Sequence, residues 1–446
     1  MKLFGTDGIR GKAGTAPLIP ETVARVGAAL VRAFNGDQGR VHRFVIGRDT
    51  RESGTWIEQE LAHGLTSQGA TVISAGVVPT PAIAHLARTE GFDAGIVISA
   101  SHNPFEDNGI KVFGGSGTKL AEQMERAVES LVADASWSVP AAAGRIERDR
   151  GDLCSHYVQH LLKILSSAGP LTGAPMVVDC ANGATQPLAP GLFRDLGFEV
   201  EAIGVSPDGR NINLDCGSTH LDGLARAVVA SKARLGVAFD GDGDRALFVD
   251  HTGKIVDGDA ILLMSAIHLH ARNRLPGPAV VATVMSNIGL EIALRDRGIE
   301  MIRTAVGDKY VMEEMVKRGC ALGGEQSGHV IFSDHLHTGD GLATALNVLR
   351  IMADSGQELA DLAGALVTHP QVLVNVRVKQ RTDLKTVPAI AAAMERVEAR
   401  LAGNGRLLVR YSGTEPLLRI MLEGKNDDHI RAWANEIADV VKEQLA

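Results

Sequence analysis

Three aspartates alternate with glycines in the segment VAFDGDGDRALFVD, at Asp240, Asp242 and Asp244. Carboxylates this close together repel one another unless a cation or protons lie between them. Oxygen ligands at this density suit Mg²⁺, which commonly joins protein carboxylates to phosphate oxygens. An EF-hand does not fit, because Arg245 replaces its required glycine and His251 its bidentate glutamate. A solvated acidic turn remains as the alternative, and the flanking apolar runs favour a metal site.

A serine, Ser101, follows an apolar run and precedes an Asn-Pro turn in VISASHNPFEDNGIKVFGG. By itself such a serine is typical of a turn or a cap. The segment is not a G-x-S-x-G elbow, and His102 is too close in sequence to be an easy base for its neighbour. The aspartate cluster changes the interpretation, because a phosphorylated serine provides a dianion that Mg²⁺ can bind and activate. Lys111 could then neutralise charge or move a proton.

Three further segments could bind phosphate or hydroxyl groups. RYSGTEPLLRIMLEG offers hydroxyls and backbone N–H groups between two arginines, which fits either an anion site or an ordinary hairpin turn. GGEQSGH places Glu325, Ser327 and His329 at alternating positions, so they share a face if the segment is extended. His329 could act as acid or base, or could be hydrogen-bonded structure. FGTDGIRG carries Arg10 on a loop that could bind phosphate or only begin a strand.

The elements that position these residues alternate along the chain. FVIGRD precedes the helical pattern TWIEQELAHGLTSQG, TVISAG precedes PAIAHLARTEG, and similar pairs follow further on. This alternation predicts mixed or parallel sheets covered by helices. Ligands of such sheets bind beyond the carboxyl ends of the strands. We therefore expect loops from several units to point at one shared site.

Breaks in the alternation predict four domains. The polar stretch SVPAAAGRIERDRGD indicates a boundary near residue 150, and a strand, helix, strand, strand, helix pattern begins near THPQVLVNVRVK. The expected fold is three mixed-sheet α/β domains of similar build plus a smaller C-terminal α+β domain. The domains and their loops are 1–150 with Ser101, 151–250 with the aspartates, 251–366 with GGEQSGH, and 367–446 with the Ser-Gly-Thr turn.

Composition limits the function classes. The chain has 446 residues, a formal net charge of −8 and no basic run, which argues against a nucleic-acid or anionic-membrane surface. Its four cysteines form no C-x-x-C pair, and MKLFGTDGIRG does not resemble a signal peptide, so we expect a cytoplasmic protein with reduced thiols. A P-loop and a G-x-G-x-x-G fingerprint are both missing, which disfavours P-loop NTPases and dinucleotide enzymes.

Taken together, FGTDGIRG, SASHNP, DGDGDR, GEQSGH and SGTEP resemble the hallmark blocks of the α-D-phosphohexomutase family, in the family's order and over essentially the whole chain. The resemblance implies four domains around a central cleft, a phosphoserine at Ser101, and one Mg²⁺ per chain bound by Ser101 and the three aspartates. It also implies reaction-centre residues, which are Arg10, Lys111, Arg245 and His329. The substrate-binding residues that it implies are Glu325, Ser327, Lys309, Arg410, Ser412, Gly413, Thr414 and Arg419.

Within this family the chain most resembles the bacterial branch that isomerises glucosamine phosphates. Gln326 stands where enzymes for mannose and glucose phosphates usually carry methionine, and PDGRNIN and VGDKYV are also similar to that branch. Lys309 stands where an arginine is frequent, and Tyr411 is not the commonest residue of its loop. The expected reaction interconverts glucosamine 6-phosphate and glucosamine 1-phosphate, with glucosamine 1,6-bisphosphate as intermediate and activator, and supplies amino-sugar nucleotide and cell-wall precursor synthesis.

Other functions remain open from the sequence. A phosphomannomutase/phosphoglucomutase would use the same chemistry, a phosphatase would hydrolyse the phosphoserine, and a sugar-phosphate sensor would not react at all. The expected partner is a phosphorylated amino sugar, and the expected assembly is a monomer or a homodimer.

Overall fold

The computed structural model describes residues 2–5, 7–34, 40–141, 146–149, 151–412 and 416–445. The chain forms two compact units, Met1–Met285 with Met301–Gly364, and Ser286–Glu300 with Ala365–Ala446. Among the described residues, no helix is both long enough and apolar enough to cross a membrane.

The first sheet of the larger unit positions the loop that carries Ser101. Its seven strands lie in the order β1-β2-β6-β5-β3-β4-β7. They are β1 Phe4–Gly5, β2 Gly8–Lys12, β3 Arg43–Arg48, β4 Thr71–Val77, β5 Ala94–Ile98, β6 Asp107–Gly114 and β7 Ile146–Arg148. β5 is buried along its whole length and parallel to β3, as a continuous apolar run predicts for a central strand. Ser101 therefore follows the carboxyl end of a central strand.

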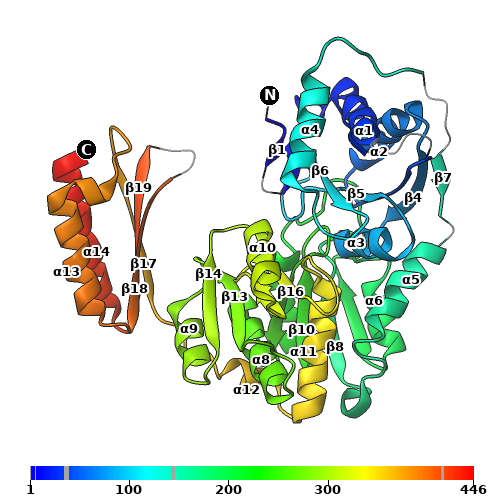
Figure 1. The fold of residues 1–446 in the computed structure, drawn as a ribbon. Coiled ribbons are helices and arrows are strands. Elements are labelled where there is room, and N and C mark those ends of the chain that lie inside the picture. Colours follow the sequence, from blue (N-terminus) through cyan, green and yellow to red (C-terminus); the bar gives the residue numbers. More distant parts are fainter. Residues whose placement is uncertain are drawn as a thin grey trace. The chain divides into compact units, whose positions relative to one another are not determined.

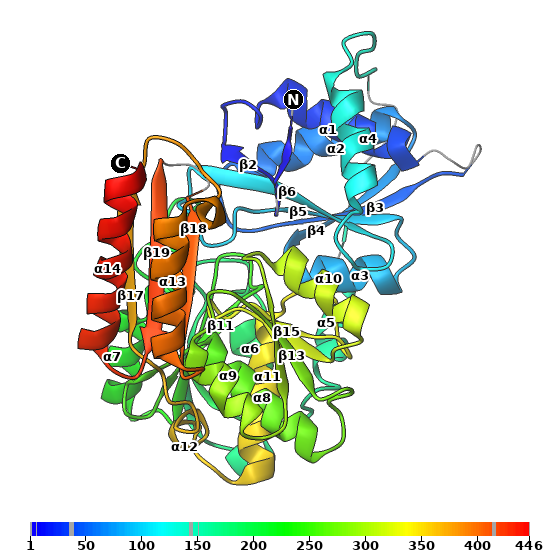
Figure 2. The same ribbon diagram turned by 60° about the vertical axis from the view of Figure 1, so that its left-hand side comes forward.

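Helices cover both faces of this sheet (Figure 1, Figure 2). The helices are α1 Pro20–Phe34, α2 Gly54–Ser67, α3 Thr80–Thr89 and α4 Glu122–Ala133. α1, α2 and α4 share one apolar core with the sheet, and α3 packs on the opposite face against β3 and β5. This packing fixes the strands whose ends carry the polar loops.

β7 differs from the sequence interpretation of its segment. The stretch around residue 150 reads as a polar break, yet Ile146–Arg148 extends the sheet by pairing in parallel with β4. Its side chains are half-buried or exposed, as expected for an edge strand. Such a strand lacks the apolar pattern that marks the central ones.

The second sheet positions the aspartates. Its five strands lie in the order β12-β11-β10-β8-β9. They are β8 Pro175–Asp179, β9 Glu199–Ile203, β10 Leu235–Phe239, β11 Ala246–Asp250 and β12 Ile255–Val256, with helices α5 Asp152–Leu161, α6 Ala189–Asp195 and α7 Asp222–Ser231. β10 and β11 are antiparallel neighbours, so DGDGDR forms the short connection between two fully buried strands.

The third sheet carries the GGEQSGH segment. Its strands, in the order β14-β13-β15-β16, are β13 Ala279–Thr283, β14 Glu300–Thr304, β15 Leu322–Gly324 and β16 Val330–Phe332. Its helices are α8 Gly258–Ala271, α10 Asp308–Arg318, α11 Gly341–Ser355 and α12 Leu359–Ala363. The segment is not extended: Gly328 has φ +91° and its N–H donates to the Glu325 carbonyl, so the segment turns between two antiparallel strands, and the condition for a shared strand face is not met.

The smaller unit contains the antiparallel sheet β17-β19-β18. Its elements are α9 Ile288–Arg295, β17 Gln371–Arg377, α13 Pro388–Leu401, β18 Gly405–Tyr411, β19 Leu417–Gly424 and α14 Asp427–Leu445. α13 and α14 share a core with the sheet (Figure 1). The strand, helix, strand, strand, helix order is the one predicted from the sequence.

Candidate active site

Ser101 has an uncommon backbone conformation. Its φ is +52°, and its side chain is almost completely buried. A left-handed conformation in a residue other than glycine costs on the order of 1 kcal/mol and is often found at functional sites. Ser101 Oγ donates a hydrogen bond to Asp240 Oδ2 and lies 3.2 Å from His102 Nδ1. The serine predicted to carry phosphate thus faces the predicted metal ligands.

The aspartates gather as their spacing predicted. One carboxylate oxygen from each of Asp240, Asp242 and Asp244 lies within 4.8 Å of the others, and all three side chains are buried. Burial, and then Asp244 and Asp242, raise the pKa of Asp240 well above its usual range. Oδ1 of Asp242 has no hydrogen-bond partner among the described residues, and Oδ1 of Asp244 faces only the His329 ring, 3.6 Å away, and the Arg245 guanidinium, 4.0 Å away. A buried cluster of hard oxygen ligands, one of them unpaired, fits Mg²⁺.

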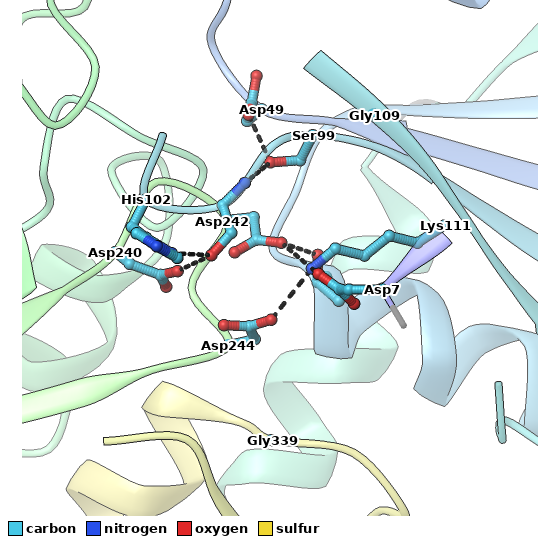
Figure 3. A network of polar contacts seen from close by, with 12 residues as sticks. Asp7, Asp49, Ser99, His102, Gly109, Lys111, Asp240, Asp242, Asp244 and Gly339 are labelled. Carbon is cyan, nitrogen blue, oxygen red and sulfur yellow. Dashed lines mark hydrogen bonds and ion pairs between the residues drawn. The ribbon is translucent and has the colours of Figure 1, made fainter. Parts of the chain in front are cut away.

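Lys111 provides the nearest opposite charge (Figure 3). Its Nζ lies 2.9 Å from Asp242 Oδ2, 3.2 Å from Asp244 Oδ2 and 3.2 Å from Asp7 Oδ2. Burial lowers the pKa of Lys111, but Asp242 and Asp7 outweigh burial and raise it well above its ordinary value. Burial raises the pKa of Asp244, but the charge of Lys111 opposes this effect and helps to hold that pKa well below its usual range.

A cavity of about 480 Å³ opens beside these groups. Its polar lining includes six of the residues predicted from the sequence, namely Arg10, Ser101, Asp244, Arg245, Glu325 and His329. Lys309 lies elsewhere, in a neighbouring cavity lined by α4 and α10, with Nζ 4.0 Å from Glu125 Oε2. Ser327 has a buried Oγ with no hydrogen-bond partner among the described residues.

His329 lies between two carboxylates. Its Nδ1 is 3.6 Å from Asp244 Oδ1, and its Nε2 is 3.7 Å from Asp308 Oδ2. Burial lowers the pKa of His329, but Asp244 and Asp308 raise it to about 9. The N–H of Gly339 donates to Nε2 at 3.0 Å, which opposes a second proton on the ring. Because Nε2 accepts this N–H, the geometry places a single ring proton on Nδ1, toward Asp244, against the direction in which the two carboxylates shift the pKa.

Sequence reasoning missed Lys119 and Asp308. Lys119 Nζ donates to Asp7 Oδ1 at 2.6 Å and to Asp308 Oδ1 at 2.8 Å, and Arg10 also pairs with Asp7. Asp308 lies in the VGDKYV motif, which the sequence analysis noted without assigning a role to this aspartate. Lys119 had no local signal, because it reaches its partners only through the fold.

The C-terminal residues lie in the smaller unit. Arg410 and Arg419 are register partners on the adjacent strands β18 and β19, so their side chains share one face of the sheet. Ser412 is buried, and its N–H donates to the Leu417 carbonyl at 2.8 Å. Gly413 and Thr414 lie outside the described residues.

Four family models cover nearly the whole sequence. They describe phosphoglucomutase/phosphomannomutase α/β/α domain I over residues 1–138, domain II over 155–253, domain III over 257–369 and the C-terminal domain over 373–440. The chain belongs to the phosphoglucomutase/phosphomannomutase family.

Relatives in this family match the chain over its full length. A protein from Solibacter usitatus named phosphoglucosamine mutase is 49% identical, with 99% of each chain covered. A protein of the same name from Geobacter sp. strain M21 is 48% identical and covers 100% of this chain and 98% of its own.

Solved structures of the family share the fold. A phosphoglucomutase/phosphomannomutase family protein from Burkholderia thailandensis has a TM-score of 0.81 at 27% identity, covering 99% of this chain and 97% of its own. N-acetylphosphoglucosamine mutase from Aspergillus fumigatus, solved with GlcNAc-6P and magnesium, has a TM-score of 0.67 at 18% identity, with 99% and 95% covered. The three α/β domains and the smaller C-terminal domain are thus those of the phosphoglucomutase/phosphomannomutase family.

Proposed function

We propose that this enzyme interconverts glucosamine 6-phosphate and glucosamine 1-phosphate, using Ser101 as the phosphoryl carrier. The observation that carries the proposal is the position of Ser101, whose Oγ contacts Asp240 at the edge of a cavity lined by cationic and carboxylate groups. The choice of an amino sugar is supported by full-length relatives, named phosphoglucosamine mutase, that are 46–49% identical.

Two phosphoryl transfers complete the reaction. A sugar hydroxyl attacks the phosphorus of phospho-Ser101, the P–Oγ bond breaks, the hydroxyl proton passes to a base in the site, and Oγ takes up a proton from an acid in the site. The product is glucosamine 1,6-bisphosphate, which then turns over within the site. Ser101 Oγ then attacks the phosphorus of the other phosphate and passes its proton to a base. The bond between that phosphorus and the sugar oxygen breaks, the sugar oxygen takes up a proton, and the isomeric monophosphate is released with phosphoserine restored. Lys111 and His329 are the candidates for moving these protons.

We assign the metal ligands to Asp240, Asp242, Asp244 and the phosphate on Ser101. When bound, one Mg²⁺ offsets negative charge on the transferring phosphoryl group. Arg10, Lys111 and Arg245 add positive charge around that group.

The remaining assignments concern the substrate. Glu325 and Ser327 are proposed to bind the sugar, and Lys309 is proposed to join them by turning from the neighbouring cavity, where it lies 4.0 Å from Glu125. The phosphate that is not reacting is proposed to bind the C-terminal loop, through Arg410, Ser412, Gly413, Thr414 and Arg419. One loop can serve both substrates because each of them presents a phosphate. We propose that the enzyme works in the cytoplasm, as a monomer or a homodimer.

The deciding experiment is the intact mass of the purified protein before and after phosphatase treatment, with peptide mapping around residue 101. We expect a removable phosphate on Ser101 whose loss lowers mutase activity and whose return from glucosamine 1,6-bisphosphate restores it. Ser101→Ala should abolish turnover, whereas Ser116→Ala, at an exposed serine, should not. A protein that glucosamine 1,6-bisphosphate cannot phosphorylate would contradict the proposal and favour a sugar-phosphate sensor.

Substrate comparison separates the other candidates. We expect a higher kcat/KM for glucosamine 1-phosphate than for glucose 1-phosphate, and the reverse would indicate a phosphomannomutase/phosphoglucomutase. Inorganic phosphate released in excess of isomerised sugar would indicate a phosphatase.

A further inference from the structure

Two side chains from distant segments hold the loop that carries Ser101. The carbonyl oxygen of Ser101 accepts hydrogen bonds from Arg51 Nη2 and from Asn213 Nδ2, both at 2.9 Å. The carbonyl of Asn103 accepts from the same two groups, at 2.9 Å from Arg51 and 3.2 Å from Asn213. Arg51 Nη1 also donates to the Pro104 carbonyl. We call Arg51 and Asn213 the carbonyl clamp.

Arg51 is itself fixed by Asp49. The guanidinium is completely buried, and its Nε donates to Asp49 Oδ2 at 2.8 Å. Asp49 Oδ2 also accepts from Ser99 Oγ at 2.5 Å, and Ser99 Oγ accepts the N–H of Ser101 at 2.9 Å (Figure 3). Both the N–H and the carbonyl of Ser101 are therefore connected to one buried carboxylate, which fixes the peptide on each side of the nucleophile.

Asn213 connects the same loop to the second sheet. It ends the PDGRNIN segment, has φ +58°, and its N–H donates to the Ala181 carbonyl at 2.9 Å. Gly241 lies against it: a Cβ there would be 2.6 Å from the Ser101 oxygen and 2.8 Å from Asn213 Nδ2. Gly241 stands between Asp240 and Asp242 in the sequence. Its close packing against the Ser101 carbonyl and Asn213 therefore also sets the position of Ser101 relative to the aspartates.

The clamp residues are absent from the described lining of the cavity, so they act through Ser101 rather than on a ligand. A serine released from the left-handed region would relax toward an ordinary backbone conformation and move Oγ away from Asp240. We propose that Arg51 and Asn213 are positioning residues that keep Ser101 in its left-handed conformation, aimed at the aspartate cluster, for phosphoryl transfer. This inference rests on the proposed role of Ser101 as the phosphoryl carrier.

Two variants test the clamp in the full-length, phosphorylated, Mg²⁺-loaded enzyme. Asn213→Gly keeps a backbone that tolerates positive φ but removes the amide, and Arg51→Lys keeps the charge beside Asp49 but cannot reach three carbonyls. Asn273→Gly, at an exposed asparagine with φ +54°, and Arg48→Lys, in the Arg48–Glu58 pair, are the matched controls.

The measurements are single-turnover transfer of ³²P from Ser101 to glucosamine 1-phosphate, steady-state KM, and the ³¹P resonance of phospho-Ser101. We expect transfer to slow by roughly 10- to 100-fold in both clamp variants, because a phosphoryl donor misplaced by about 1 Å loses this much rate. KM should stay within about twofold, since the clamp binds no substrate, and the ³¹P resonance should shift or broaden. The controls should match wild type.

A purely structural role would lower thermal stability while the folded molecules kept the wild-type transfer rate and resonance, and that result would overturn the inference. If Asn213→Gly does not fold, Arg51→Lys carries the same test. The outcome for wild type separates this inference from the proposed function. Wild-type enzyme that fails to transfer its phosphate to the sugar contradicts the proposed function, whereas normal transfer in wild type and in both variants contradicts the clamp alone.

Discussion

Lys111 shows how a single residue can hold the reaction centre together. Its ammonium group contacts Asp7, Asp242 and Asp244, and the lysine side chain is only 3% exposed. An ion pair that is removed from water adds little stability by itself, but loss of one partner leaves buried charge without compensation. Removal of the lysine should therefore cost more stability than its ion pairs contribute, because it leaves buried carboxylates without a counter-charge.

Lys111→Met should lower the free energy of unfolding by about 3–5 kcal/mol and abolish turnover, because the carboxylates would then repel one another in a buried site. Urea unfolding at pH 7.5 measures the first effect. Lys317→Met, which removes an exposed pair with Glu314, should change stability by less than about 1 kcal/mol. A Lys111→Met protein as stable as wild type would show that the carboxylates are neutral or otherwise paired.

The aspartates give a second prediction, on metal removal. Chelation should abolish mutase activity and lower the Tm, and added Mg²⁺ should restore both. At a Mg²⁺ concentration a hundredfold above Kd, binding would stabilise the folded protein by about 2.7 kcal/mol. Asp242→Asn removes one charged donor and should weaken this Mg²⁺-dependent rise in Tm. A wild-type Tm that does not respond to Mg²⁺ would contradict the assignment.

At the scale of elements, glycine allows two helices of the first domain to approach closely. A Cβ at Gly64 of α2 would lie 1.9 Å from the carbonyl oxygen of Ala24 in α1, and a Cβ at Gly27 of α1 would lie 2.3 Å from that of Leu61. Since the clashing atoms belong to the backbone, rotation of a side chain could not relieve the contact. The helix pair must separate to accept any other residue.

Gly64→Ala should therefore destabilise the protein by at least about 2 kcal/mol, measured by chemical denaturation. Gly223→Ala in α7 is the matched control, because a Cβ there meets nothing within 4 Å, and alanine should be neutral or stabilising by up to about 1 kcal/mol. The kcat of folded Gly64→Ala enzyme should be close to wild type, since Gly64 touches no site residue. An equally stable Gly64→Ala protein would contradict the close helix approach.

The elements that the sequence predicted are those with strong local patterns. β5 and β10 are continuous apolar runs, and the polar loops follow them as expected. β7 escaped prediction because an edge strand needs no apolar face. The conformation of Glu325–His329 was left open because alternation of polar residues alone does not distinguish a strand from a turn. The periodicity of apolar residues indicates which residues are buried. The conformations of these two segments depend instead on backbone hydrogen bonds to other segments.

The candidate site also contains residues that the sequence revealed and residues that only the fold revealed. Ser101 and the three aspartates stand in short motifs whose residue types already suggest their chemistry. Lys119 reaches Asp308 across 189 positions and Asn213 reaches Ser101 across 112, so neither contact leaves a trace in local spacing. Asp308 and Asn213 lay in motifs that were noticed, but only the fold gave them partners.

At the scale of the whole molecule, a cluster of histidines connects segments that three different family models cover. The rings of His85 on α3 and His160 on α5 stack with centroids 4.3 Å apart, and His335, which follows β16, lies 6.2 Å from His160. Burial lowers the pKa of His85 to about 3, and that of His160 and His335 to about 4. Nearby Arg88 and Lys163 further oppose protonation of the stacked pair.

These shifts predict that mild acid destabilises the protein. Between the folded pKa near 4 and an unfolded value near 6.5, the unfolded chain binds protons that the folded chain does not. The stability is therefore complete above about pH 7 and is lost as the pH falls from about 6.5 toward 4, at about 1.4 kcal/mol for each unit of pKa difference. Urea midpoints measured from pH 4.5 to 7.5 should fall steadily below pH 6.5.

His160→Gln should flatten this decline, because it removes one site that protonates only on unfolding and also relieves His85. His251→Gln, at an exposed histidine away from the cluster, should follow the wild-type curve and serves as its control. An unchanged slope in His160→Gln would mean that carboxylates, rather than the packed histidines that join three domains, set the acid limit. The aspartate cluster can be separated from this effect, because its contribution depends on Mg²⁺ and that of the histidines does not. If the histidines dominate the decline, the slope of the urea midpoint against pH between 4.5 and 6.5 should be the same with and without Mg²⁺.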